Sequence, residues 1–133
     1  MHDRPTPTEL LDAVAAFLRE QVVPASSGSL AYHARVAANA LDIARREIAL
    51  APAARQREQA ALVALLGADP ATDLAQLNRM LCERIASGAI GLDTPGLAGC
   101  LWQITLDRLA VDQPTYDTYL RSLGQAASTD EDR

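Results

Sequence analysis

The sequence contains no lysine, few aromatic residues and only two cysteines. All twelve basic residues are arginine, and seventeen carboxylates outnumber them, which gives a formal net charge of −5. No basic run is present, so neither nucleic acid nor an anionic membrane is expected as a partner. Cys82 and Cys100 form no CxxC pair, and we expect both to be buried, reduced thiols.

Long apolar runs and catalytic motifs are also missing. No stretch approaches the roughly 18 apolar residues that span a bilayer. Residues 1–11 lack the basic-then-apolar layout of a signal peptide, so we expect a cytoplasmic protein. The sequence shows no glycine-rich phosphate loop and no cluster with metal-ligand spacing. We therefore expect no cofactor, no metal, no catalytic residue and no enzymatic activity of the chain by itself.

What the chain does contain is alanine, the strongest helix former, within a composition that is 49% apolar. The spacing of the apolar residues predicts an all-α fold, a single-domain helical bundle over residues 1–124. Residues 125–133 are polar and acidic, and we expect them to form a disordered tail. The bundle should have about five main helices and a short C-terminal one, over approximately residues 7–23, 30–50, 53–66, 74–87, 95–112 and 116–123.

Local signals fix several helix ends. Thr6 and Glu9 are spaced as a capping box, with Pro7 at the first helical position. Pro52 is expected to open the third helix or to kink its junction with the second. Gly67 is a predicted C-terminal cap, and residues 89–96 are predicted to be a loop.

The helix over residues 30–50 is apolar around more than half of its circumference. Leu41 and Ile48 lie in its apolar stripe, so we expect this helix to be the most buried of the bundle. His33 falls in the same arc, and we expect a mostly buried histidine with one hydrogen-bond partner. The functional alternative is a nucleophile, a general base or a phosphorelay histidine, although no carboxylate lies three or four residues away to orient the ring.

A polar row follows one edge of the same helix. A solvated face is the usual role of such a row. The alternative is a partner-binding edge, because arginine is enriched at protein interfaces. The row consists of Arg35, Asn39, Asp42 and Arg46.

Two charged residues fall within predicted apolar arcs, where an unpaired charge is costly. They are Glu47 and Arg108. We expect Arg108 to form an ion pair with Glu47 or with Asp112, which follows it by one helical turn.

Three segments together resemble one bacterial family of domains of unknown function. They are RPTPTELLDAVAAFLREQVVPA (4–25), SLAYHARVAANALDIARREIAL (29–50) and DRLAVDQPTY (107–116), and the resemblance extends over residues 4–121. Genes of this family commonly lie beside genes for kinases that resemble aminoglycoside phosphotransferases. The family is similar to the small subunit of the 4-hydroxyacyl-CoA kinase of levulinate catabolism.

The resemblance implies a non-catalytic accessory subunit in acyl-CoA metabolism, required by a partner kinase that phosphorylates a hydroxyacyl-CoA or a similar hydroxyl substrate. It brings no established catalytic residues. Two other classes stay open: a small phosphorelay bundle that uses His33, and a stand-alone bundle that binds a ligand or forms a homo-oligomer.

Overall fold

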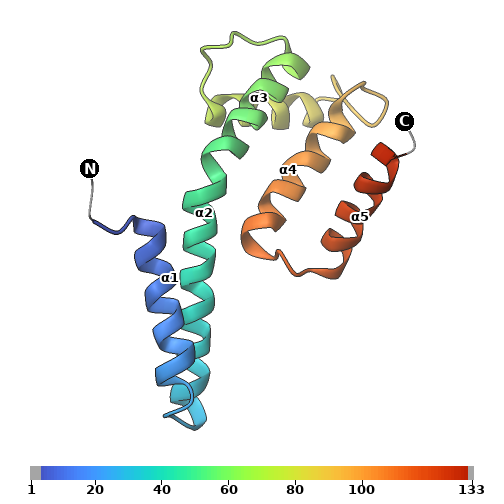
Figure 1. Cartoon of the computed structure of the whole chain (residues 1–133). Coiled ribbons are helices and arrows are strands. Elements are labelled where there is room, and N and C mark those ends of the chain that lie inside the picture. Colours follow the sequence, from blue (N-terminus) through green and yellow to red (C-terminus); the bar gives the residue numbers. More distant parts are fainter. Residues whose placement is uncertain (1–3, 132–133) are drawn as a thin grey trace. The chain divides into compact units, whose positions relative to one another are not determined.

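The computed structural model describes the backbone of residues 4–131 and the side chains of residues 4–124 (Figure 1). Every regular element in this part of the chain is a helix, so the predicted all-α class is confirmed. A π-helical turn, η1, directly continues α1. The elements are α1 (Pro7–Phe17), η1 (Leu18–Val22), α2 (Gly28–Leu66), α3 (Leu74–Ala86), α4 (Leu97–Asp112) and α5 (Asp117–Glu131).

The second and third expected helices form a single helix, α2, of 39 residues with Pro52 inside it. A proline within a helix lacks the N–H that would bond the carbonyl of Ile48, which weakens the helix at this point. The chain divides into two compact units at the same residue, unit 1 over Met1–Ala51 and unit 2 over Pro52–Arg133.

The predicted boundaries of the bundle domain and of the tail stay predictions. Residues 132–133 of that tail lie outside the described residues, as do the side chains of residues 125–131.

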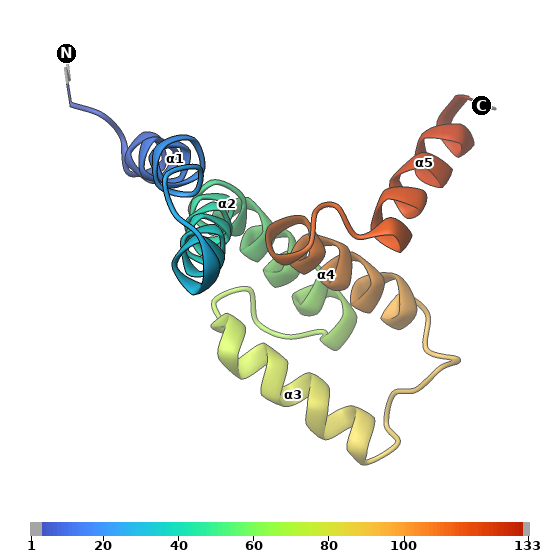
Figure 2. The same ribbon diagram turned by 90° about the horizontal axis from the view of Figure 1, so that it is seen from below.

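Unit 1 is a hairpin of α1 and the first part of α2, which lie side by side (Figure 2). The predicted capping box is present at the start of α1. The Glu9 backbone N–H donates to Thr6 Oγ1 at 3.2 Å, and the Thr6 N–H donates to Glu9 Oε2 at 2.7 Å. These two bonds satisfy backbone donors that the first helical turn leaves free.

The buried residues of the hairpin are all small. Alanines occupy every buried position of residues 4–51: Ala15, Ala31, Ala34, Ala38 and Ala51. The expectation that residues 30–50 form the most buried helix is therefore wrong, because Leu41 is only half-buried and Ile48 is 48% exposed. A broad apolar arc can be covered only by several neighbouring helices, and within unit 1 this segment has one neighbour.

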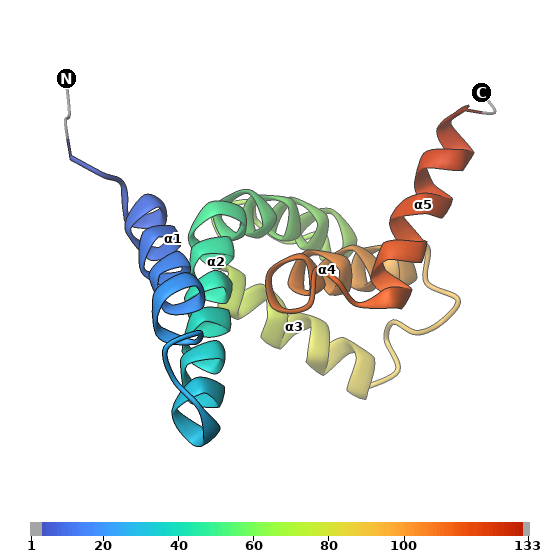
Figure 3. The same ribbon diagram turned by 60° about the horizontal axis from the view of Figure 1, so that its bottom comes forward.

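Unit 2 has a core of large side chains. Leu62 and Leu77 are completely buried, and Val63, Met80 and Ile104 pack around the core at its edges. The second part of α2, α3 and α4 all contribute to it (Figure 3). The buried cluster consists of Leu62, Leu66, Leu77, Leu81, Leu97 and Cys100.

Polar contacts fix the helix ends and the helix pairing in unit 2. Gly67 adopts φ 61°, the left-handed conformation expected of the predicted cap. Arg84 Nη1 donates to the Leu66 carbonyl at 2.7 Å, which satisfies an acceptor at the end of α2. Arg57 Nη2 lies 2.9 Å from Asp107 Oδ1 and ties α2 to α4.

We predict that Leu77→Ala destabilises unit 2 by about 2–5 kcal/mol, the usual loss when a fully buried leucine is truncated and leaves a cavity. Leu92→Ala is the matched control, because Leu92 is 97% exposed in the loop before α4. Denaturant unfolding followed by circular dichroism measures both variants. Equal unfolding midpoints for the two would contradict the assignment of the core.

Candidate partner-binding site

One side of the unit 1 hairpin is polar, and we call it the polar flank. It includes the whole row that the sequence predicts along α2, together with residues of α1 and η1. Its members are Asp12, Arg19, Arg35, Asn39, Asp42, Arg45 and Arg46.

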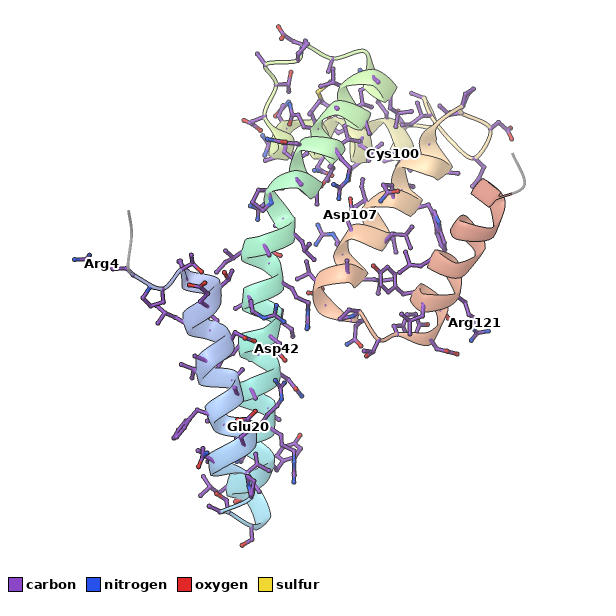
Figure 4. The ribbon with its side chains drawn as sticks, viewed as in Figure 1. Arg4, Glu20, Asp42, Cys100, Asp107 and Arg121 are labelled. Carbon is purple, nitrogen blue, oxygen red and sulfur yellow. The ribbon has the colours of Figure 1, made fainter. Side chains whose placement is uncertain are left out.

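Arg19 joins the two helices across this flank. Its Nη2 atom donates to Asn39 Oδ1 at 2.9 Å and to Asp42 Oδ2 at 2.6 Å. The Asp42 side chain is only 18% exposed, and it lies on α2 near α1 (Figure 4). The Arg19–Asp42 ion pair therefore helps to fix which sides of the two helices adjoin.

Arg45 adds a weaker link between the same helices. Its Nε atom lies 3.9 Å from Asp12 Oδ1 and 4.0 Å from Asp42 Oδ1. These separations allow electrostatic attraction but are too long for a direct hydrogen bond. Ion pairs this exposed contribute modestly to stability, so the contacts set alignment more than they hold the hairpin together.

The flank contains a hollow of about 300 Å³, lined by Arg19, Val23, Arg35 and Asn39. Arg35 is exposed, so a carboxylate or phosphate oxygen can reach its guanidinium. Sequence reasoning missed Arg19 because this residue comes from η1, twenty positions before Asn39. The predicted partner-binding role of the row is not tested by this geometry and stays a prediction.

His33 does not lie where the sequence predicts. It is exposed, and its ring meets the Tyr32 ring edge-on with the two centroids 5.5 Å apart. The buried α2 residues nearest to it, Ala31 and Ala34, face α1, whereas His33 lies outside that contact. The prediction of a mostly buried His33 is wrong, because a single neighbouring helix covers only one side of α2.

The predicted ion pair between Arg108 and Asp112 is wrong. Arg108 and Asp112 are both exposed, and no ion pair joins them within the described part of the chain. The α4 residue that carries the ion pair is Asp107, whose side chain is 17% exposed and binds Arg57. Arg108 can keep its charge in water, which costs nothing in desolvation. Glu47 is exposed in unit 1, and its predicted pairing with Arg108 stays untested.

The two cysteines differ in environment. Cys100 is buried as expected, whereas Cys82 is exposed, so its predicted burial is wrong. Burial raises the pKa of the Cys100 thiol, and the negative charge of Glu58 raises it further.

Among the described residues, no three His, Cys, Asp or Glu side chains gather into a group that could hold a metal ion.

Unit 2 carries a second hollow, of about 630 Å³, between α2 and the segment that leads into α3. Its walls include Val63, Pro70 and Leu74, with Arg55 and Gln59 among the polar residues that line it. The Gln59 side-chain amide donates to the Thr72 carbonyl and braces that segment. The hollow could accept an apolar group, which suits the ligand-binding alternative.

Every regular element of the described residues is a helix, and no polar or charged residue among them is buried. The chain belongs to the family described as Domain of unknown function (DUF6285), whose model matches residues 24–116. The match begins after α1 and extends through α2, α3 and α4. No curated protein and no solved structure matches the chain. None of the described helices is long and apolar enough to cross a membrane.

We predict that an alkylating reagent labels Cys82 much faster than Cys100 at mildly alkaline pH. Cys82 is exposed, while Cys100 is buried and its raised pKa leaves less thiolate at any given pH. Mass spectrometry of the digested protein measures both sites over time. Unfolded protein serves as the control, because there the two thiols should react at similar rates. Equal labelling in the folded protein contradicts the environment described for Cys100.

Proposed function

We propose that the chain is a non-catalytic accessory subunit of a kinase that resembles aminoglycoside phosphotransferases and phosphorylates a hydroxyacyl-CoA or a similar hydroxyl substrate. The identity of the partner rests on the sequence resemblance of residues 4–121. The role of a binding subunit is supported by the large apolar side chains that the molecule exposes at its surface.

The observation that carries the proposal is the number of large apolar side chains at the surface. Sixteen are exposed in the described chain, whereas the buried set has seven besides the alanines. Both units contribute, with Tyr32 in unit 1 and Trp102 and Tyr116 in unit 2. Extended apolar surface marks sites of protein association, and Trp and Tyr are enriched among the residues that dominate binding energy.

The polar flank would fix the orientation of the kinase on the hairpin. Arg35 is exposed beside the hollow, and Arg46 follows it three turns along the same face of α2. A guanidinium binds a carboxylate through two parallel hydrogen bonds, which fixes geometry as well as adding affinity. We expect acidic side chains of the kinase to lie against this edge.

Charge reversal tests the edge. The double variant Arg35→Glu/Arg46→Glu should weaken binding to the proposed partner kinase about tenfold or more. The reason is that losing a charge-assisted hydrogen bond costs about 1.5–3 kcal/mol. Binding is measured by calorimetry with purified kinase. The matched control is Arg79→Glu/Arg121→Glu, which reverses two exposed arginines of unit 2 and should bind as wild type.

Kinase assays with and without the chain test the function itself. The kinase should phosphorylate its substrate poorly alone and efficiently with the chain added. Full turnover without the chain contradicts the accessory role. Full-strength binding by the Arg35→Glu/Arg46→Glu variant contradicts only the choice of edge.

The exposure of His33 favours a second candidate, a phosphorelay bundle, because phosphoryl transfer requires an accessible imidazole. Incubation with a histidine kinase and labelled ATP should then give an acid-labile phosphate that is lost in His33→Gln. The accessory-subunit proposal expects no such label, so the experiment decides between the two candidates.

A further inference from the structure

The unit 1 hairpin fully buries no large side chain within residues 4–51, although Leu11, Leu18 and Leu41 are half-buried. Its buried residues are alanines, from Ala38 at 0% exposure to Ala51 at 8%. Alanine side chains let two helices approach closely but remove little apolar area from water. A hairpin of this kind is one layer of helices, and stable helical architecture needs a second layer against it.

The side of the hairpin away from the polar flank is apolar. Leu10, Val14 and Phe17 follow one another at helical spacing on α1 and are 51%, 48% and 57% exposed. Asp12 of α1 and Arg19 of η1 lie on the other side of this helix, where they reach Arg45 and Asp42. The opposite side of α2 must therefore adjoin these three apolar residues. Helical geometry places Leu30, Leu41 and Ile48 there. We call these six residues the apolar flank.

We propose that the apolar flank packs against the apolar flank of a second copy of the chain, so that two hairpins form a four-helix bundle around a two-fold axis. The inference does not depend on the proposed function, because it concerns a different side of the hairpin from Arg35 and Arg46.

Charge favours a second copy as the occupant. A two-fold axis sets each surface against itself, so a charged face would meet like charge and an uncharged face would not. None of the six residues of the apolar flank is charged. Residues 1–51 as a whole are nearly balanced, with five arginines and six carboxylates, whereas residues 52–133 hold seven arginines and eleven carboxylates. Two hairpins can therefore approach with little repulsion.

The size of the flank also fits a dimer. Two adjacent helices of about 16 residues present a face roughly 24 Å long and 20 Å wide. Because side chains project from such a face, it would bury more than its flat area, on the order of 500–800 Å² per copy. This area approaches the ~800 Å² per partner of a standard interface. The second hairpin would supply the layer that each hairpin lacks.

Val14 gives the sharpest test, because it lies between Leu10 and Phe17 near the middle of the flank and therefore near the two-fold axis. Sedimentation velocity of the full chain should show a species of twice the 14.2 kDa monomer mass. Val14→Asp should bring two carboxylates together at the axis and raise the dissociation constant about tenfold or more, the effect of about 1.4 kcal/mol.

Val36→Asp is the matched control. Val36 has a similar exposure, 46%, but lies two residues from both Ala34 and Ala38, which places it on the side of α2 away from α1. It should dimerise like the wild type. Circular dichroism checks that both variants keep their helical content.

A crosslink makes the test independent of any loss of folding. Val14→Cys in a Cys82→Ser background should form a disulfide between two copies under mild oxidation, whereas Val36→Cys in the same background should not. A monomeric wild type at all concentrations, or dissociation by Val36→Asp and not by Val14→Asp, overturns the proposal. If Val14→Asp abolishes kinase binding and leaves self-association intact, the kinase occupies this flank and the proposed dimer is wrong while the proposed function stands.

Discussion

The contact on which unit 1 depends is the row of alanines between α1 and α2. Ala15 of α1 and Ala31, Ala34 and Ala38 of α2 let the two helices lie close together, but they bury little apolar surface. Two consequences follow from the small size of these side chains. The large apolar residues of both helices are half-buried, as Leu11, Leu18 and Leu41 are, or exposed on the hairpin. The alignment of the helices also needs polar help, which the Arg19 guanidinium supplies by binding Asn39 and Asp42 across the seam.

Unit 2, in contrast, is held together by a core of large apolar side chains. Leucines from α2, α3 and α4 meet in one cluster, and the Arg57–Asp107 ion pair and the Arg84 side chain fix the helices that carry it. The boundary between the units falls at Pro52, where α2 lacks one backbone hydrogen bond. The chain thus combines a unit with its own leucine core and a hairpin whose apolar side chains are available for association.

The sequence predicts the local features well and the burial poorly. The capping box at Thr6 and the left-handed cap at Gly67 depend on residues within a few positions of one another, so spacing alone identifies them. The all-α class and the family follow in the same way from patterns along the chain.

The burial of individual residues could not be predicted in this way. The burial of His33 and Ile48 depends on how many helices surround α2, whereas the periodicity of the sequence shows only which side of the helix is apolar. Arg19 could not be assigned to the site from the row on α2, because its contacts cross between helices. The prediction that Pro52 opens a third helix is wrong, because α2 continues through it, and the alternative prediction of a kink stays a prediction.

If the proposed dimer forms, the hairpin reaches its stable form only when a second layer covers its apolar flank. Amide hydrogen exchange of the full chain at increasing protein concentration tests this most directly, because exchange reports local opening of each helix. Amides of α1 and of residues 30–50 should become more protected as concentration rises, while those of α3 should keep the same protection throughout. Protection of the hairpin that is already as high as that of α3 in dilute solution, and that does not change with concentration, would contradict it.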